Sequence, residues 1–253
     1  MIFILRHLEI GEPSCTKLGK CISKNGIRVD IGENLTKKCN LLIRWGVSSP
    51  VSLYSFGIQI NSPESIQKIV QKDYCRKILQ ENKISTPKSF FSKEEALESK
   101  KNFPLIGRPR YHTQGKNITI YESNKEIMNS PSQAYYSEYI PKEKEFRVYI
   151  FNKKVIGIAE KIPKNKSDIA WNSHCGADFL DRNDQNRNYI QIKNEALRAC
   201  EIIGCVFTGV DIMTHKNIPY ILELNSSIAL SNKHRVKIFC KEFVNFYNEN
   251  FST

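Results

Sequence analysis

Apolar residues along this chain fall into short runs of strand length, interrupted by a few stretches with helical spacing. Near the start, residues 2–5 and 40–44 are apolar runs that predict strands. Between them, residues 14–24 have the spacing of an amphipathic helix, which Asn25-Gly26 would close because glycine readily adopts the left-handed backbone of a helix end. These elements predict a small α/β unit over residues 1–64.

A second unit, residues 65–133, starts with a long helical pattern over residues 65–83. Its apolar positions recur at helical spacing: Ile66, Ile69, Val70, Cys75, Ile78 and Leu79. The pattern stops before Pro87, which cannot continue a helix. Strands at residues 103–108 and 118–122 follow, joined by a polar loop.

The third unit, residues 134–253, consists mainly of strands. Strands are predicted at residues 134–140, 145–151 and 154–161, and helices at residues 189–203 and 232–249. A long polar loop separates the last of these strands from the first helix. Three successive small units of antiparallel strands with a few helices predict an α+β fold.

Two apolar runs of the third unit, residues 208–213 and 218–225, flank a polar break and predict a β-hairpin. The hairpin can place Asp211 beside Glu223, and strand alternation puts Glu223 and Asn225 on one face, with Leu222 and Leu224 on the other. Two carboxylates and a side-chain carbonyl form a ligand set suited to Mg²⁺. The alternative is a hairpin whose solvent face happens to be polar.

The composition of the chain indicates which partners it would bind and in which compartment it would lie. The 253 residues carry a formal net charge of +12, which favours polyanionic partners such as nucleotide phosphates, an acidic peptide or nucleic acid. No apolar stretch approaches the roughly 20 residues of a membrane span, and the first residues predict a strand rather than a signal peptide. Eight cysteines without metal-ligand spacing indicate reduced thiols, hence a cytoplasmic protein.

Several segments occur together in a fixed order between residues 72 and 230. They are Lys72 before a helix that ends at Ile84-Ser85-Thr86-Pro87, the strand of residues 103–109 with Arg108, a loop around Gly115, Ser137-Glu138-Tyr139-Ile140, Glu145-Phe146-Arg147-Val148, Lys161, Trp171-Asn172-Ser173-His174-Cys175-Gly176, and Glu223-Leu224-Asn225-Ser226-Ser227. This series strongly resembles the ATP-grasp fold, and within it the RimK-type ribosomal-protein glutamate ligases and their relatives. The resemblance implies an ATP-grasp fold with a shortened N-terminal α/β domain.

The same resemblance implies where ATP would bind. Lys72 would contribute to ATP binding, Arg108 would contact the phosphates in the place of the family's lysine, and Gly115 would lie in a flap over them. Glu138, Tyr139 and Ile140 would frame adenine, and a carboxylate near Glu143 or Glu145 would suit the ribose hydroxyls. The Gly115 segment could instead be a plain hairpin loop.

The remaining residues of these segments would carry out catalysis and bind the metal. By the resemblance, Arg147, Lys161, Asn172 and His174 would act on phosphate or acceptor, and Asp211, Glu223 and Asn225 would hold Mg²⁺, or Mn²⁺. Arg147 could instead pair with Glu145 or a neighbouring strand, and His174 could be a surface residue. Ile228-Ala229 stands where relatives often have Pro-Gly.

The implied activity is an ATP- and Mg²⁺-dependent carboxylate–amine ligase that forms an amide or peptide bond through an acylphosphate. Its acceptor would be an amino acid, a peptide or a protein, and the basic balance favours an acidic one. Two alternatives stay open: an ATP-grasp kinase that phosphorylates a small molecule, and a non-catalytic module that binds nucleotide or nucleic acid.

Overall fold

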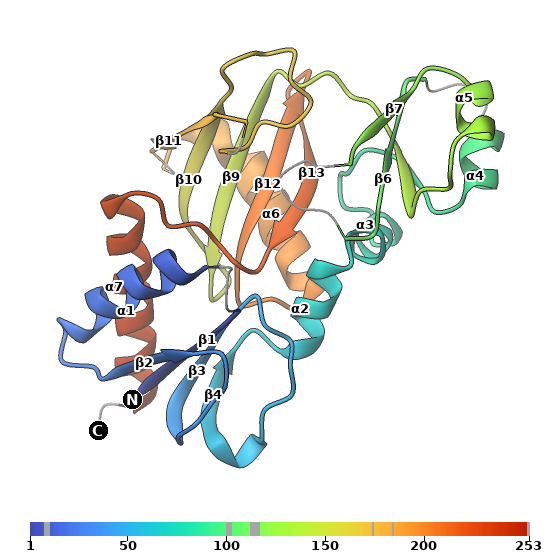
Figure 1. Ribbon diagram of the computed structural model, residues 1–253. Helices are drawn as coiled ribbons and strands as arrows, with labels where there is room; N and C mark the ends of the chain where they lie inside the picture. Colours follow the sequence, from blue (N-terminus) through green and yellow to red (C-terminus); the bar gives the residue numbers. More distant parts are fainter. Residues whose placement is uncertain (8–10, 100–102, 112–116, 174, 184, 252–253) are drawn as a thin grey trace.

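The computed structural model describes residues 1–7, 11–99, 103–111, 117–173, 175–183 and 185–251. Its strands form three sheets (Figure 1): an N-terminal sheet at the lower left, a five-stranded sheet in the middle and a small sheet at the right. Helices and sheets succeed one another in separate units, as an α+β fold requires.

The N-terminal sheet is parallel, in the order β2-β1-β3-β4. Its strands are β1 (Ile2–Arg6), β2 (Val29–Gly32), β3 (Cys39–Trp45) and β4 (Phe56–Ile60), the last preceded by the 3-10 turn η1 (Leu53–Ser55). Helices α1 (Glu12–Ser23) and α7 (Lys233–Phe251) pack against each other beside it (Figure 1). The α/β unit predicted for residues 1–64 is therefore completed by α7, a helix from the end of the described chain.

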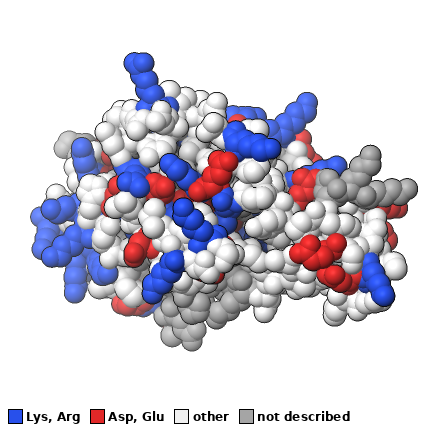
Figure 2. Space-filling view, turned by 90° about the horizontal axis from the view of Figure 1, so that it is seen from above, with Lys and Arg blue, Asp and Glu red and all other residues white. Residues whose placement is uncertain are grey.

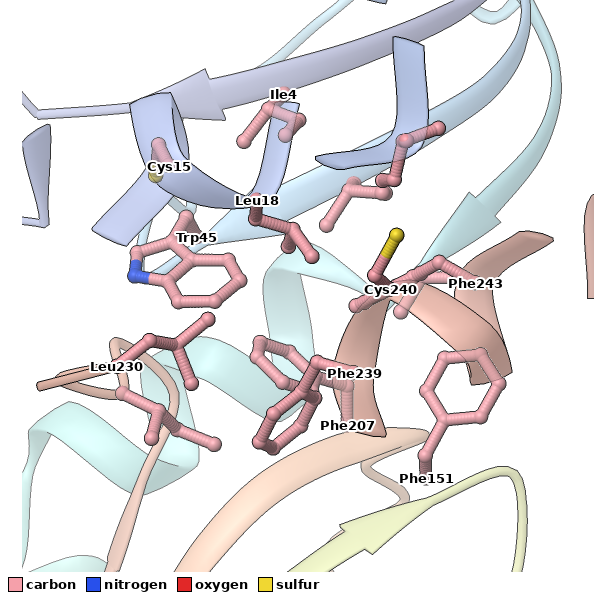
Figure 3. Close-up of a cluster of buried hydrophobic side chains, with 14 of the residues drawn as sticks. Ile4, Cys15, Leu18, Trp45, Phe151, Phe207, Leu230, Phe239, Cys240 and Phe243 are labelled. Carbon is pink, nitrogen blue, oxygen red and sulfur yellow. The ribbon is translucent and has the colours of Figure 1, made fainter. Parts of the chain in front are cut away.

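One hydrophobic core joins this sheet to the five-stranded sheet. The ring of Trp45, at the end of β3, lies 4.8 Å from that of Phe207, and Phe239 and Phe243 of α7 complete the cluster (Figure 3). These aromatic side chains are almost fully buried. Burial of so much apolar surface fixes the N-terminal unit against the strands that carry the predicted metal ligands.

The helix predicted over residues 65–83 is wrong as a single element. The structure has α2 (Pro63–Val70) and α3 (Lys72–Glu81), separated at Gln71, whose ψ of 89° is not helical. The backbone N–H of Lys72 donates to the carbonyl of Arg110, an acceptor outside the helix. This tertiary contact replaces a helical hydrogen bond, so the apolar spacing continues across a break that it does not reveal.

The small sheet is antiparallel, in the order β5-β8-β6-β7. It contains β5 (Ser89–Phe90), β6 (Leu105–Arg108), β7 (Thr119–Tyr121) and β8 (Tyr135–Glu138), with α4 (Lys93–Glu98) and α5 (Asn124–Asn129) beside it. The strand predicted to open the third unit is β8, and it pairs with this sheet. The division into residues 1–64, 65–133 and 134–253 stays a prediction, and β8 favours a later start for the third unit.

The five-stranded sheet is antiparallel, in the order β11-β10-β9-β12-β13. Its strands are β9 (Lys144–Phe151), β10 (Lys154–Ile162), β11 (Asp178–Arg182), β12 (Phe207–His215) and β13 (Ile218–Asn225). Helix α6 (Ile190–Ile203), which follows the 3-10 turn η2 (Arg187–Tyr189), buries one face of the sheet. The opposite face carries the charged side chains described below.

Most of the predicted strands and helices are present, with bounds shifted by a few residues. Six short elements were not predicted from the sequence: β2, β4, β5, β11, α4 and α5. Both short helices had a recognisable signal, because Ser92 and Ser123 cap them and each is followed three residues later by a glutamate. No helix in the described ranges combines the length and the apolar character that crossing a bilayer requires.

Candidate active site

The β12–β13 hairpin brings together the three residues predicted to bind metal. Asp211 lies directly opposite Glu223 in the ladder, which confirms the predicted pairing. The Asn225 amide nitrogen donates to Glu223 Oε1 at 3.1 Å and lies 3.5 Å from Asp211 Oδ2. The three side chains therefore converge, although their role as metal ligands stays a prediction.

A β-bulge in this hairpin corrects one detail of the predicted alternation. The register shifts between Asp211 and Ile212, so that Ile212 faces Ile221. Leu224 is buried in the core under α6, as the alternation requires, whereas Leu222 lines a cavity on the other side of the sheet. The bulge turns one side chain away from its expected face, a common effect of an extra residue in one strand.

Arg147 makes the central contact of the charged face. Its Nε and Nη2 donate to Oδ1 and Oδ2 of Asp211, both at 2.7 Å, across the β9–β12 ladder. A methyl group added at Gly209 would lie 3.3 Å from Cδ of Arg147, so glycine there leaves room for the arginine side chain. Arg147 pairs with the neighbouring strand, one of the alternatives considered above, and it does so with a predicted metal ligand.

A second carboxylate extends this contact into a network. Lys161 Nζ donates to Asp211 Oδ2 at 2.8 Å and to Glu145 Oε1 at 2.5 Å. Lys142 Nζ donates to Glu145 Oε2 at 2.7 Å and to the carbonyl of Ile169. Both oxygens of Glu145 therefore have cationic partners, and its predicted contact with ribose would have to compete with two lysines.

Burial and charge set the protonation of this network. Burial opposes ionisation of Asp211, but Arg147 and Lys161 outweigh it and hold the pKa of its carboxyl well below the usual range. Burial also opposes the charge on Lys161, but Asp211 and Glu145 raise its pKa. Burial lowers the pKa of Lys142. The central contacts are thus ion pairs at neutral pH.

Lys72 joins the network from the first turn of α3. Its Nζ donates to the carbonyl of Leu224 at 2.8 Å and lies 3.8 Å from Glu223 Oε2. Burial opposes ionisation of Glu223, but Lys72 is the main charge that lowers the pKa of its carboxyl. Four cations (Lys72, Lys142, Arg147, Lys161) here meet three carboxylates (Glu145, Asp211, Glu223). An anionic ligand would restore the balance.

Metal binding is chemically compatible with this donor set. Carboxylate oxygens and an amide oxygen from adjacent strands are the hard ligands that Mg²⁺ prefers. A cation there would draw on Asp211 oxygens that now accept from Arg147 and Lys161. The residues present therefore fit a divalent metal, at the expense of contacts within the network.

The residues predicted to frame adenine line a narrow cavity between the small sheet and the five-stranded sheet. Its lining includes Ile106, Arg108, Ser137, Glu138, Tyr139, Ile140, Met213 and Leu222. The N–H of Tyr139 donates to the carbonyl of Pro104 at 3.1 Å and is unavailable to a ligand. Within the described part of the chain, the N–H of Ile140 has no protein acceptor, which leaves it as the donor of this edge.

Two arginines also line this cavity. Among the described residues, the buried Nε of Arg108 has no hydrogen-bond partner. Arg76, almost fully buried on α3, donates to the carbonyls of Ile221 and Leu222 and has no carboxylate partner in the same ranges. Two guanidinium groups without a described carboxylate partner favour an anion in this cavity.

Two of the predicted site residues, Gly115 and His174, lie outside the described residues. Asn172 uses its side-chain oxygen to accept the N–H of Cys175 at 2.8 Å, which shapes the turn that follows. Its predicted contact with phosphate or acceptor stays a prediction. The eight cysteines are free thiols, and Cys200, in α6, and Cys205, just after it, are buried, as expected for core residues.

Several residues of the site were missed by the sequence analysis. Lys142 lies under the ring of Trp171 at 4.6 Å, and Arg76 follows Lys72 by one helical turn. The four-residue spacing of two cations on α3 was a readable signal, because such residues share a helix face. Lys142 is close in sequence to its partner Glu145, but its contacts with Ile169 and Trp171 come from a distant segment and left no local signal.

A larger cleft, of about 700 Å³, lies on the opposite face of the five-stranded sheet, at the start of α6. Its lining includes Lys144, Phe146, Arg187 and Tyr189; of the residues considered for the site, it includes Glu143 alone. Its size alone would make it a candidate binding site. The charged face is the better candidate, because the convergent ionised groups and the uncompensated arginines are there.

The surface of the protein also carries an excess of basic side chains. On the face shown in Figure 2, Lys and Arg side chains predominate at the left and centre and surround a smaller group of acidic ones. This distribution agrees with the net charge of +12. A surface of this kind attracts anions, with an effect that falls as salt is added.

The chain is similar in sequence to known ATP-grasp proteins. A family model described as a RimK-like ATP-grasp domain matches residues 70–241. A protein named probable alpha-L-glutamate ligase from Shewanella halifaxensis is 25% identical over 187 residues, which cover 68% of this chain but only 39% of that protein. Glutamate–LysW ligase ArgX from Sulfolobus acidocaldarius is 26% identical over 203 residues, which cover 68% of this chain and 69% of that protein.

Solved structures give the same answer for the fold. The ATP-grasp ligase PsnB, complexed with minimal precursor, Mg and ADP, superposes with a TM-score of 0.69 at 13% identity, covering 96% of each chain. D-alanine–D-alanine ligase from Bacillus anthracis, complexed with ATP, has a TM-score of 0.66 at 16% identity, covering 98% of this chain and 97% of that one. Similarity at this level of identity confirms the predicted ATP-grasp fold.

Proposed function

Because the chain belongs to the RimK-like ATP-grasp family, we propose that it is an ATP- and Mg²⁺-dependent carboxylate–amine ligase. The chain spans well under two thirds of the Shewanella glutamate ligase. The proposed activity is therefore argued from the residues of this chain's own site. The proposed reaction forms an amide or peptide bond, with ADP and phosphate as the other products.

The bidentate contact of Arg147 with Asp211 carries the proposal, together with Lys161, which reaches the same carboxylate. Arginine and lysine held side by side in a buried site can stabilise the charge on a phosphoryl group during transfer. A structural ion pair would need only one cation for one carboxylate. Here the cations are in excess, as a site for an anion requires.

In the proposed first step, a substrate carboxylate oxygen attacks the γ-phosphorus of ATP. The bond from that phosphorus to the β–γ bridging oxygen breaks, giving an acylphosphate and ADP. Arg147 and Lys161 would contact the transferring group, while Lys72 and Arg108 would hold the remaining phosphates. Mg²⁺ bound by Asp211, Glu223 and Asn225 would neutralise phosphate charge.

In the second step, an amine attacks the acyl carbon, and the carbon–oxygen bond to phosphate breaks. The amine loses a proton as the amide forms, and inorganic phosphate leaves. Water must stay out because it would hydrolyse the acylphosphate. Trp171 and Ile169, which cover Lys142 at the edge of the nucleotide cavity, are suited to exclude it.

We further propose that the substrate is acidic. The names of the sequence relatives include glutamate ligases, and PsnB was solved with a precursor. An acidic amino acid, peptide or protein would suit the excess of cations at the site and the net charge of +12. Eight free thiols fit the reducing cytoplasm, which we propose as its compartment.

Mass spectrometry of the protein incubated with ATP, Mg²⁺, and pooled amino acids and acidic peptides tests this function. A ligase yields a product that equals two substrates less one water, together with ADP. A phosphorylated alcohol would identify a kinase instead. ATP left unconsumed in every pool, by a protein that binds it, would favour the non-catalytic module.

A further inference from the structure

The ring of Phe179, in β11, is contacted by three cations at once. The guanidinium carbon of Arg147 lies 5.2 Å from the ring centroid, Lys161 Nζ lies 5.6 Å from it, and the guanidinium carbon of Arg235 lies 5.6 Å from it. All three distances are within the roughly 6 Å at which a ring face attracts a cation. Such contacts occur about once per 70–80 residues, so three on one ring are not a background occurrence.

Two elements hold Phe179 in this position. In the β10–β11 ladder it lies directly opposite Lys161. On the other side, Arg235 of α7 donates to the Phe179 carbonyl at 2.6 Å and to Asp181 Oδ1 at 2.7 Å. Arg235 is almost fully buried. The ring is thus fixed by β10 and α7 and lies against both cations that contact Asp211.

The ring gives Arg147 and Lys161 an anchor that does not depend on Asp211. Their shared carboxylate is also one of the three predicted metal ligands, so a bound divalent cation would compete for its oxygens. Arg147 has no carboxylate partner other than Asp211 among the ion pairs of the described residues. Phe179 cannot bind the metal, and its attraction for the cations persists when Asp211 is drawn away.

We propose that Phe179 is a positioning residue of this site, whose ring keeps Arg147 and Lys161 directed at the transferring phosphoryl group when the metal engages Asp211. This inference rests on the proposed function for its catalytic consequence. The placement of Arg147 on the ring is a separate claim, which can be measured without any turnover.

The experiment compares Phe179→Leu, which removes the ring, with Phe179→Tyr, which keeps it. The matched control is Tyr189→Leu, because Tyr189 is also half-buried and contacts Phe146 on the opposite face of the same sheet, at 5.5 Å between ring centroids. Urea unfolding confirms that each variant folds, and calorimetry with ADP and Mg²⁺ measures nucleotide binding. The direct readout is the NMR resonance of the Arg147 Nε–H, with and without ADP and Mg²⁺.

In the wild type, the ring current should shift the Arg147 Nε–H resonance upfield, both with and without metal. We expect Phe179→Leu to abolish this shift and to lower kcat roughly tenfold, a moderate loss of transition-state stabilisation, with little change in the Kd for ADP. Phe179→Tyr should retain the upfield shift and the wild-type kcat, and Tyr189→Leu should leave the shift and kcat unchanged.

An Arg147 resonance that is the same in Phe179→Leu and wild type would overturn the proposal. So would an unchanged kcat in Phe179→Leu, or an equal loss in Tyr189→Leu. Absence of ligase activity in the wild type would contradict the proposed function instead, and the NMR shift would still decide whether the ring holds Arg147.

Discussion

Arg147 and Asp211 face each other on adjacent strands and share two hydrogen bonds of 2.7 Å. The carboxylate is buried, and its second oxygen also accepts from Lys161. Asp211 therefore orients two cations, Arg147 and Lys161, and is also a predicted metal ligand. Replacing it should affect stability and turnover together.

Asp211→Asn should lower the free energy of unfolding by about 3 kcal/mol, because it leaves two buried cations without their shared carboxylate. ATP turnover should fall by roughly a hundredfold or more, since a charged ligand and the anchor of Arg147 are both lost. Urea unfolding and an ADP-release assay measure the two effects.

The control for this variant is Asp30→Asn. Asp30 pairs with Arg28 at 3.5 Å, and both side chains are solvent-accessible. Exposed pairs contribute little, so the expected change is less than about 0.5 kcal/mol, with normal turnover. Equal stability losses in the two variants would show that the buried network does not stabilise the fold.

The pH dependence of stability, measured without metal, should also report Asp211. Its pKa is lowered in the folded protein, whereas the unfolded value is about 3.9. The ionised form therefore stabilises the fold fully above about pH 3.9, and this contribution is lost as the pH falls below that value. Urea titrations of wild type and Asp211→Asn should differ by a constant amount above about pH 5, and the difference should shrink in acid. A difference that grows in acid would be inconsistent with the lowered pKa.

Apolar runs predicted much of this fold because several strands are buried on both faces and therefore appear in the sequence as continuous apolar segments. The pairing of Asp211 with Glu223 was readable because a short polar turn joins two apolar runs. The break at Gln71 and the bulge after Asp211 were not readable. Both depend on contacts between distant segments, which leave no local periodic pattern.

Nucleotide choice should depend on the edge formed by Glu138 and Ile140. The N–H of Ile140, which has no acceptor among the described residues, can donate to adenine, and the Glu138 carboxylate can accept from the adenine amine. Guanine presents a carbonyl oxygen where adenine has the amine, and that oxygen would face an acceptor. We expect ADP to bind at least roughly tenfold more tightly than GDP. Equal affinities in calorimetry would exclude this edge as the adenine site.

Arg108 should contribute to ATP binding mainly through its charge. Arg108→Ala should weaken ADP binding roughly tenfold, and Arg108→Lys should stay within about threefold of wild type, because a lysine still supplies the cation. Arg187→Ala is the control, since Arg187 is exposed and lines the cleft on the opposite face. Loss of binding in the lysine variant equal to that in the alanine variant would show that the guanidinium fork itself is needed.

The charge network was only partly predictable from sequence. Arg147, Lys161 and Glu145 could be named because they fall in recognisable segments. The structure joins Arg147 to Lys161 through Asp211, and Lys161 contacts Glu145 directly. Phe179 carried no signal, since a single aromatic residue after a polar loop is usually a core residue. Its contacts arise from the pairing of β10 with β11, which only the fold defines.

Oxygen transfer tests the central claim, that this site passes a phosphoryl group from ATP to a substrate carboxylate. The protein is incubated with ATP, Mg²⁺, an amine and the carboxylate substrate found by the screen, labelled with oxygen-18 in its carboxyl group. In the acylphosphate route, one carboxylate oxygen leaves with inorganic phosphate. We expect labelled phosphate in an amount equal to the amide product. Amide formed together with unlabelled phosphate would contradict it.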